Sequence, residues 1–252
     1  MKIVHSPVKQ IIELENHIFL LKIHSPEIAN SIKPGQFLNI KVSDNIYPLL
    51  RRPFSVCDVE GENIFLMFNI FGEGTKILAH KKIGDDVDIL GPLGNGFNFE
   101  DDFDTAIIVA GGLGVAPFPF LNRYLKDKEI YSFIGGRSSK DVITYKIINP
   151  EISTDDGSLG FRGTVVELLA QNLHRINNRK VKIFACGPNA MLRALRELCL
   201  EKNLLCEAST ECAMACGFGI CQGCPIESSN NPDKYLLVCK DGPVFNISEV
   251  II

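Results

Sequence analysis

Residues 211–224 read ECAMACGFGICQGC and residues 236–239 read LLVC, so four cysteines follow the order C-x4-C-x2-C with a distant fourth. This spacing is typical of a plant-type [2Fe–2S] cluster. Such a loop wraps closely around inorganic sulfides, and its three glycines suit that task because glycine permits close backbone approach and unusual φ values. These loop glycines are Gly217, Gly219 and Gly223. The predicted cluster ligands are Cys216, Cys221, Cys224 and Cys239.

A structural zinc site is the alternative for the same cysteines. Zinc sites usually combine two C-x2-C knuckles that stand well apart in the sequence. Here three cysteines are crowded into residues 216–224 with a four-residue gap. The spacing therefore favours iron and sulfide. A zinc-stabilised binding module without a redox role stays open, and the visible spectrum of the purified chain distinguishes the two.

The bulk composition bounds the class of protein. The chain has 252 residues, of which 46% are hydrophobic and 22% charged, as in ordinary globular proteins. A net charge of −4 without a Lys/Arg block gives no sign of a nucleic-acid partner. The first ten residues lack the pattern of a signal peptide, and the apolar run 106–121 is too short and interrupted to span a membrane. We therefore expect a cytoplasmic protein whose nine cysteines serve metal chemistry rather than disulfides.

Residues 1–98 have the pattern of a small antiparallel β-barrel, with short apolar segments separated by turns that contain proline or glycine. In GQFLNIKV (35–42), apolar and polar residues alternate, which predicts a half-buried strand with Asn39 and Lys41 on its polar face. One helix is expected in this part of the chain, over TKILAHK (75–81).

Two stretches of this first part carry groups that suit a dinucleotide. In RRPFSV (51–56), Arg52 can grip a pyrophosphate, Phe54 offers a flat face, and Ser55 offers a donor and an acceptor. Taken alone, this stretch is more typical of an edge strand with solvated arginines. GEGTK (72–76) opens the expected helix, where backbone N–H groups can bind an anion. Taken alone, it is equally compatible with an ordinary turn.

The next hundred residues alternate strands and helices. TAIIVA (105–110) is a continuous apolar run, as expected of a parallel strand buried on both faces. Residues 130–134 and 181–185 read as further strands, which together indicate a doubly wound α/β fold. GGLG (111–114) follows the first strand directly, where a dinucleotide pyrophosphate would lie. Because it is not the full G-x-G-x-x-G signature, a tight turn is the alternative.

Three helices are predicted in this part. One runs through VAPFPFLNRYLK (115–126), where the prolines are tolerated near the first turn. Thr164 and Glu167 form a capping box before VVELLAQN. On the helix that follows the CGP motif, helical spacing predicts three buried side chains, Met191, Leu195 and Leu198. Buried small hydrophobic positions are expected for Cys57, Cys199 and Cys206.

Taken together, R-P-F-S, G-E-G-T, GPLGNGF (91–97), G-G-x-G-x-x-P and C-G-P resemble the ferredoxin–NADP reductase superfamily. Asn69 departs from the arginine that this superfamily carries there. The resemblance assigns FAD contacts to Arg52, Pro53, Phe54, Ser55, Met67, Phe68, Asn69, Gly74 and Thr75. It assigns nicotinamide nucleotide contacts to Gly111, Gly112, Gly114, Cys186, Gly187 and Pro188. Arg137 is a candidate for the adenosine ribose or a 2′-phosphate, and the choice between NADH and NADPH stays open.

The chemistry of these cofactors sets their order. A nicotinamide exchanges two electrons as a hydride, a [2Fe–2S] cluster carries one, and a flavin handles both modes. The expected sequence is NAD(P)H, FAD, [2Fe–2S] and an external partner. No catalytic acid, base or nucleophile is expected, because the protein binds, orients and tunes the cofactors.

The order of the three segments resembles, from end to end, the electron-transfer subunits of NAD-dependent (type B) dihydroorotate dehydrogenases. MACGFGICQGCP (214–225) is the most specific part of this match, supported by RRPFSV, GEGTK and DDGSLGFRG (155–163). The resemblance implies a separate FMN-containing catalytic subunit that oxidises dihydroorotate in pyrimidine biosynthesis, in a heterotetramer of two plus two. Alternative partners are a hydrogenase or a ferredoxin:NADP oxidoreductase. Cys212 departs from the family pattern and is not expected to be a ligand.

The expected organisation is therefore a multidomain protein with three parts. Residues 1–98 form an antiparallel FAD-binding β-barrel, and residues 99–208 form the doubly wound α/β domain that binds NAD(P). Residues 209–252 form a small C-terminal plant-type [2Fe–2S] domain. This last segment is too short for an independent core, so its burial should depend on its neighbours.

Overall fold

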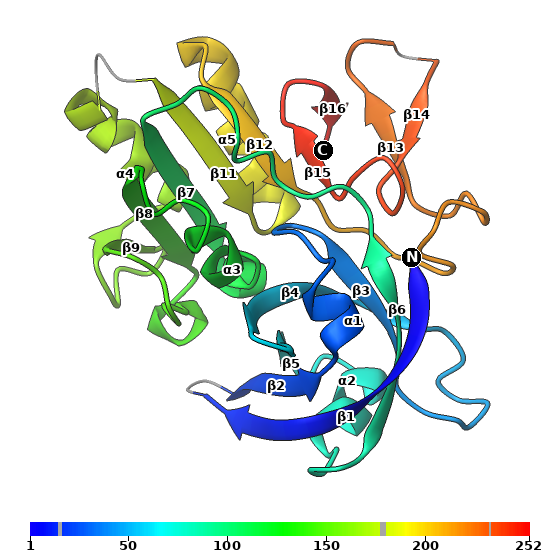
Figure 1. Cartoon of the computed structure of the whole chain (residues 1–252). Helices are drawn as coiled ribbons and strands as arrows, with labels where there is room; N and C mark the ends of the chain where they lie inside the picture. The colour runs from blue at the N-terminus through cyan, green and yellow to red at the C-terminus, as the bar shows by residue number, and fades with distance from the viewer. Residues whose placement is uncertain (15–16, 177–179, 232) are drawn as a thin grey trace.

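The computed structural model describes residues 1–14, 17–176, 180–231 and 233–252. Figure 1 shows a barrel in blue to cyan, an α/β sheet in green to yellow, and an orange-to-red C-terminal segment that lies beside both. The sheets are a closed antiparallel barrel, a seven-stranded sheet and a three-stranded sheet. This is the multidomain β and α/β class that the sequence predicts.

The barrel forms because each strand carries one apolar face that points to a shared core. Its strand order is β1-β2-β5-β4-β3-β6. Short helices α1 (Pro26–Ala29) and α2 (Glu73–Ala79) cover its openings, and α2 confirms the one helix expected in this part. The strands are β1 (Lys2–Glu13), β2 (Ile18–His24), β3 (Phe37–Lys41), β4 (Arg52–Glu60), β5 (Asn63–Asn69) and β6 (Asp86–Leu93).

Strand β3 is more buried than its alternating pattern predicts. Asn39 was expected on a solvent-facing side, and this expectation is wrong, because the side chain is completely buried. Its Nδ2 donates a hydrogen bond to the carbonyl oxygen of Cys216 at 3.2 Å, so the cysteine loop covers this face of the barrel. Lys41, two residues further along the same strand, is only partly buried. A contact between residues 177 positions apart leaves no local sequence signal.

The large sheet has the order β10-β9-β8-β7-β11-β12-β15. All of its neighbouring strands pair in parallel except β12 and β15. Strand β7 has β8 on one side and β11 on the other, so the chain reverses its direction of travel across the sheet here, and such a switch point is where α/β sheets bind ligands. The strands are β7 (Thr105–Gly111), β8 (Glu129–Gly136), β9 (Pro150–Thr154), β10 (Phe161–Arg162), β11 (Val181–Cys186), β12 (Leu205–Ser209) and β15 (Val244–Asn246).

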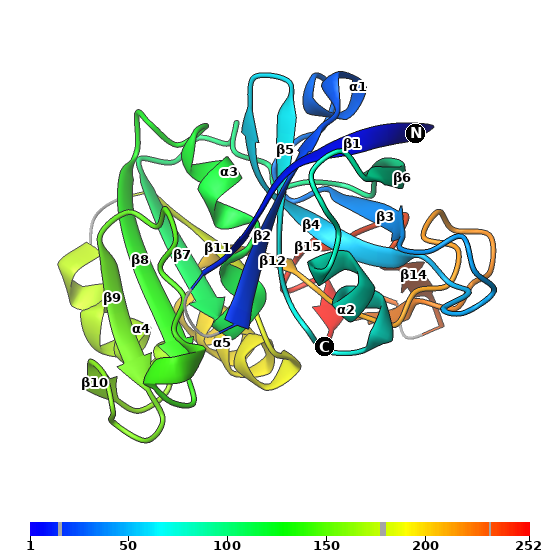
Figure 2. The same ribbon diagram turned by 90° about the horizontal axis from the view of Figure 1, so that it is seen from below.

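Helices cover both faces of this sheet (Figure 2). Helix α3 (Phe118–Asn122) packs on the face toward the barrel, while α4 (Val165–Asn172) and α5 (Asn189–Lys202) pack on the other. The capping box of α4 is confirmed, since Glu167 N–H donates to the Thr164 hydroxyl. None of the helices in the described part of the chain has the length and apolar character needed to cross a bilayer.

Two details of the predicted helices are wrong. The stretch 115–126 was expected to be one helix, but a 3₁₀ turn over Gly112–Val115 precedes a short α3. Pro117 and Pro119 lack the N–H groups that an α-helix needs, which delays its start. On α5 the buried side chains are Leu192, Leu195 and Cys199, while Met191 and Leu198 are partly buried. The buried face is therefore shifted by one residue from the predicted one.

The C-terminal segment forms a small sheet of its own, with the order β14-β13-β16. The strands are β13 (Pro225–Ser228), β14 (Tyr235–Leu237) and β16 (Val250–Ile251). Its core contains Cys224 and Cys239, packed against Phe37, Leu90 and Leu93 of the barrel. Strand β15 leaves this segment and pairs with β12, which extends the large sheet. As expected for so short a segment, its burial depends on both neighbouring parts.

A buried ion-pair cluster joins the barrel to the α/β part. Asp58 of β4 is almost fully buried and accepts from Arg123, with Nε–Oδ1 and Nη2–Oδ2 distances of 2.5 and 2.9 Å. Lys146 adds a third contact to Asp58 at 2.8 Å, and Glu60 accepts from the same lysine at 2.6 Å. Because the partners lie 65 and 88 residues from Asp58, this cluster fixes the two parts relative to each other.

Candidate functional site

The four predicted cluster ligands come together at one edge of the barrel. Cys216, Cys221 and Cys224 lie on the irregular loop between β12 and β13, and Cys239 lies two residues after the end of β14. Gly217 and Gly219 of this loop have φ values of +80° and +90°, so they occupy the left-handed region that favours glycine.

The sulfurs are arranged as two pairs. Cys224 Sγ and Cys239 Sγ lie 3.2 Å apart, and the N–H of Cys239 points at Cys224 Sγ from 3.5 Å. In the other pair, the N–H of Cys221 points at Cys216 Sγ from 3.5 Å. Gly223 does not have the positive φ value that the sequence suggested; instead its N–H points at Cys221 Sγ from 3.4 Å. The sulfurs of Cys216, Cys221 and Cys224 therefore each accept a backbone hydrogen bond.

The environment of Cys216 favours a thiolate. Burial raises the pKa of this thiol, but the N–H groups of Cys221, Phe218 and Ile220 outweigh burial and lower the pKa to about 6. Metal ligation requires the thiolate form. The loop therefore stabilises the ionised sulfur through its own backbone.

This donor set fits a two-iron cluster better than one zinc ion. Zinc needs four ligands converging on a single point, usually with tetrahedral geometry. Two pairs of cysteines with backbone N–H groups directed at sulfur are instead the ligands and hydrogen bonds that a [2Fe–2S] cluster uses. Cys216, Cys221, Cys224 and Cys239 would hold it.

Cys212 lies between the cluster ligands and the neighbouring cavity. It packs in the same apolar group as Cys224 and Cys239, and it also lines the cavity described next. Burial, followed by contact with Cys224, raises the pKa of the Cys212 thiol to about 12.

A cavity of about 320 Å³ lies where the barrel, the large sheet and the cysteine loop meet. Its volume is within the range of small-molecule sites. Its walls are largely apolar and carry a few polar groups, which suits a flat ring system with polar edges. We call it the flavin cavity, after the predicted FAD contacts that line it. These are Pro53, Phe54, Ser55, Met67, Phe68, Asn69 and Thr75.

Arg52 and Gly74, the other two predicted FAD contacts, lie against each other beside this cavity. A Cβ atom on Gly74 would lie 2.9 Å from Arg52 Nε, so only glycine leaves room for the guanidinium group. The hydroxyl of Thr75 accepts from the N–H groups of Phe71 and Gly72, which holds the turn before α2 in place. The R-P-F-S strand and the G-E-G-T turn are therefore adjacent in space, as the resemblance predicts.

A second cavity, of about 630 Å³, opens at the carboxyl end of β7, and we call it the nucleotide cavity. Its lining includes Gly111, Gly112 and Pro188 of the predicted nucleotide contacts, together with Arg137. Leu113 borders both this cavity and the flavin cavity, so the two adjoin. Their positions at the switch point of the sheet suit a dinucleotide.

The remaining predicted nucleotide contacts pack behind these cavities. A Cβ atom on Gly114 would lie 2.3 Å from the carbonyl oxygen of Cys186, and one on Gly187 would lie 2.6 Å from Met191 Cε, so both glycines serve close packing. Cys186 borders the flavin cavity rather than the nucleotide cavity. Burial raises the pKa of its thiol, which keeps the sulfur neutral beside the flavin cavity.

Several lining residues were missed by the sequence analysis. Phe71 is almost fully exposed yet borders the flavin cavity, and it directly precedes the G-E-G-T turn. Thr210 and Glu211 also line this cavity, at the carboxyl end of β12. Ligands of α/β sheets bind beyond the carboxyl ends of the strands, and these two residues were missed because β12 itself was not predicted from the sequence.

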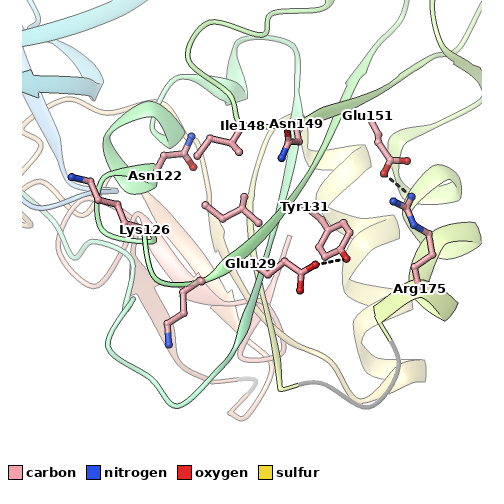
Figure 3. Close-up of a pocket in the computed structure, with 10 residues that line it drawn as sticks. Asn122, Lys126, Glu129, Tyr131, Ile148, Asn149, Glu151 and Arg175 are labelled. Atoms are coloured by element: carbon pink, nitrogen blue, oxygen red, sulfur yellow. Dashed lines mark hydrogen bonds and ion pairs between the residues drawn. The ribbon is translucent and has the colours of Figure 1, made fainter.

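A third cavity, of about 560 Å³, lies at the opposite, amino end of β8 (Figure 3). None of the predicted site residues lines it. Two pairs of its polar side chains bond to each other: Arg175 donates to Glu151 at 2.6 Å, and Tyr131 donates to Glu129 at 2.7 Å. This self-paired lining and its distance from the switch point separate it from the cofactor cavities.

Comparisons with known proteins agree with this geometry. The family model described as the iron-sulfur cluster binding domain of dihydroorotate dehydrogenase B matches residues 211–251. A dihydroorotate dehydrogenase B (NAD(+)) electron transfer subunit from Bacillus velezensis is 34% identical over 262 residues, covering 100% of both chains. A protein of the same name from Bacillus cereus is 38% identical over 255 residues, covering 95% of both chains.

Solved structures give the same architecture. A chain of an NADH-dependent reduced ferredoxin-NADP oxidoreductase superposes with a TM-score of 0.85 and 25% identity, covering 98% of this chain and 89% of that one. A ferredoxin NADP+ reductase from Neisseria gonorrhoeae, solved with FAD and NADP, has a TM-score of 0.66 and 16% identity, covering 80% and 92%, and shows the shared fold alone. The matched iron–sulfur domain and the reductase fold support FAD, a [2Fe–2S] cluster and NAD(H) as cofactors. With full-length relatives above 30% identity, the chain belongs to the family of dihydroorotate dehydrogenase B (NAD(+)) electron transfer subunits.

Proposed function

We propose that this chain passes electrons between NAD(H) and an FMN-containing catalytic subunit that interconverts dihydroorotate and orotate, by way of FAD and a [2Fe–2S] cluster. One observation carries the proposal: a single cavity is bordered by Phe54 of the barrel, Cys186 of the large sheet and Cys212 of the cysteine loop. A flavin held there borders the nicotinamide side and the cluster side at once. The curated relatives, whose names give them as electron transfer subunits of dihydroorotate dehydrogenase B, support the partner.

The bound flavin supplies exchange between two-electron hydride chemistry and the one-electron chemistry of an iron–sulfur cluster. The residues of the chain bind and orient this cofactor. Phe54 and Met67 give the cavity apolar walls, and Ser55 and Thr75 offer hydroxyl groups at its edge. The neutral thiol of Cys186 adds no charge beside the site. No proton transfer by a side chain is needed for this function.

We assign the cofactors to the residues predicted for them. FAD is assigned to residues 52–55, 67–69 and 74–75, and the nicotinamide nucleotide to residues 111, 112, 114 and 186–188. The [2Fe–2S] cluster is assigned to the cysteine pairs described above. The corresponding division of the chain is 1–98, 99–208 and 209–252, with β15 reaching back to the large sheet.

The complete enzyme is proposed to be a heterotetramer of two catalytic and two electron-transfer subunits. Its mass in solution, measured by light scattering after co-expression of both chains, tests the stoichiometry. A mass equal to one copy of each chain contradicts it.

The function itself is tested with the separate subunits. The purified chain should show flavin and iron–sulfur absorption and should oxidise NADH with an artificial acceptor. It should not oxidise dihydroorotate until the FMN-containing subunit is added, when orotate and NADH should form together. Dihydroorotate turnover by the FMN-free chain alone, or a colourless protein, contradicts the proposal.

A second candidate is the same relay serving a different partner. The likeness to the NADH-dependent reduced ferredoxin-NADP oxidoreductase, at a TM-score of 0.85, favours this candidate. Identification of the subunit that co-purifies from the native host separates the two. A ferredoxin:NADP oxidoreductase subunit in place of a dihydroorotate dehydrogenase one favours the second candidate.

A further inference from the structure

Phe71 is the most exposed large apolar side chain among the described residues, at 93%. Its ring belongs to none of the apolar clusters that form the core of this part of the chain. A phenylalanine in water forgoes the burial that makes aromatic rings major contributors to cores and interfaces. Single exposed apolar residues are common on protein surfaces, so exposure alone decides nothing. Phe71 differs because it borders the flavin cavity.

The backbone at Phe71 is held in place although its ring is free. The N–H groups of Phe71 and Gly72 donate to Thr75 Oγ1 at 2.9 and 3.2 Å. The Thr75 hydroxyl in turn donates to the carbonyl oxygen of Gly72 at 3.1 Å. Phe71 is thus part of the hydrogen-bonded turn that also carries Gly74 and Thr75, two of the assigned FAD contacts. A ring on a backbone that is already ordered loses less conformational freedom when it contacts a ligand.

The other phenylalanines of the flavin cavity are already packed within the chain. Phe37, Phe54 and Phe68 line the cavity and are at most 8% exposed. The ring centroids of Phe54 and Phe68 lie 5.6 Å apart, and Phe68 also stacks with Phe19 at 5.8 Å. These rings serve as wall. Among the described residues that line the cavity, Phe71 is therefore the aromatic side chain whose ring is still available to a ligand.

Few charges are available at this cavity to hold a pyrophosphate. None of the described residues that line it is Lys, Arg or His, and the one charged side chain among them is Glu211. Asn69 occupies the position where the superfamily carries an arginine. Arg52 lies beside the cavity, but its Nη1 already donates to the carbonyl oxygens of Leu50 and Arg51 at 2.6 and 3.4 Å. Because phosphate groups are usually held by cationic donors, contacts with the rings of FAD have to supply a larger share of its binding here.

We propose that Phe71 stacks on a flat ring of bound FAD, covers that ring from water and thereby retains the cofactor in the chain. This inference rests on the proposed function, which assigns FAD to the flavin cavity. FAD carries two flat rings, the isoalloxazine and the adenine, and each offers a face on which an aromatic side chain can stack. The contact buries the phenylalanine ring and the cofactor ring together, so both gain from leaving water.

The test compares Phe71→Ser, Phe71→Leu and Phe71→Tyr with Ile83→Ser as a matched control. Ile83 is 73% exposed in the same part of the chain and does not line the flavin cavity. Release of FAD from each purified chain after dilution is followed by flavin fluorescence. The flavin-free chains are then titrated with FAD and with FMN, which lacks the adenine ring. Iron per chain and the thermal unfolding midpoint are measured in parallel, because they report whether each variant is folded.

Phe71→Ser is expected to raise the dissociation constant for FAD about tenfold and Phe71→Leu about threefold, with faster release of FAD in both. Phe71→Tyr keeps the aromatic ring and should bind FAD as the wild type does, and so should Ile83→Ser. Iron per chain and the unfolding midpoint of the flavin-free chain should be the same throughout. Weaker binding of both FAD and FMN by Phe71→Ser places Phe71 on the isoalloxazine ring, and weaker binding of FAD alone places it on the adenine.

Wild-type affinity of Phe71→Ser for FAD overturns the proposal. Wild-type affinity of Phe71→Leu overturns it as well, because an aliphatic side chain would then serve equally and no ring stacking would be involved. An equal loss of affinity in Ile83→Ser has the same consequence, since the effect would not belong to the cavity. A wild-type chain that holds no flavin is a different result, which contradicts the proposed function instead.

Discussion

The side-chain amide of Asn39 donates to the carbonyl oxygen of Cys216 at 3.2 Å, and this hydrogen bond ties barrel strand β3 to the cysteine loop. The next residue, Gly217, has φ +80°, and a Cβ atom there would lie 2.4 Å from the same Asn39 nitrogen. The path of the loop over the barrel therefore depends both on a hydrogen bond and on the missing side chain of one glycine.

Gly217→Ala is expected to displace the cysteine loop and lower the iron content of the purified chain, while flavin content is retained. Both the left-handed backbone and the contact with Asn39 oppose the added methyl group. Iron and flavin are quantified per chain by chemical analysis and visible absorbance. Gly61→Ala is the matched control, because Gly61 also has a positive φ but has open space around it. A full iron complement in Gly217→Ala, or an equal loss of iron in Gly61→Ala, contradicts this view of the loop.

Cys221→Ala is expected to keep NADH-driven reduction of the bound flavin and to lose electron delivery to the partner subunit. Cys221 is the exposed one of the four predicted ligands and does not line the nucleotide cavity at the carboxyl end of β7, so its removal should leave that cavity unchanged. Stopped-flow absorbance reports flavin reduction by NADH, and orotate production with the catalytic subunit reports delivery. Normal delivery by this variant means that electrons bypass the cysteine loop.

Cys212→Ala tests whether Cys212 binds iron or only lies close to the predicted ligand Cys224. Cys212 packs in the same group as Cys224 but lies outside the C-x4-C-x2-C spacing of the predicted ligands, so its removal should leave the iron and sulfide content unchanged. The electron paramagnetic resonance spectrum of the reduced chain should still be that of a [2Fe–2S] centre. Loss of iron to the level of Cys221→Ala makes Cys212 a ligand and contradicts the assignment of four others.

Short-range patterns in the sequence predict the elements of this fold, whereas contacts between residues far apart in the sequence could not be predicted from it. The cysteine spacing, the apolar run of β7 and the capping box at Thr164 each lie within a few residues, so each is visible in the sequence. The burial of Asn39 depends on a loop 177 residues away, and the Asp58 cluster depends on partners 65 and 88 residues away. The helix predicted over 115–126 starts late because Pro117 and Pro119 lack the N–H groups that an α-helix needs.

Gly74→Ala is expected to lower the flavin content of the purified chain. An added methyl group would lie 2.9 Å from Arg52 Nε and push the guanidinium group from its place beside the flavin cavity. Gly72→Ala is the control within the same turn, because Gly72 has an extended backbone and nothing within 4 Å of an added Cβ atom. Flavin per chain is measured by visible absorbance, and iron per chain should be unchanged in both variants. Equal flavin content in the two variants contradicts a role for the Arg52–Gly74 contact.

Asp58→Asn is expected to reduce the free energy of unfolding at neutral pH by about 1.5–3 kcal/mol, because it weakens charge-assisted hydrogen bonds to Arg123 and Lys146. Burial raises the pKa of Asp58, but hydrogen bonds from Arg123 and Lys146 lower it by a larger amount. The pKa of Asp58 in the folded chain therefore lies below its value in the unfolded chain. The stabilisation is therefore complete above the unfolded pKa of about 3.9 and is lost as the pH falls through the folded pKa. Urea unfolding of wild type and variant should show a difference that is constant near neutrality and narrows in acid. Glu60→Gln, at a half-exposed position of the same cluster, should cost less than about 1 kcal/mol. An Asp58→Asn difference that is absent at neutral pH, or that widens in acid, shows that this cluster does not hold the barrel to the α/β part.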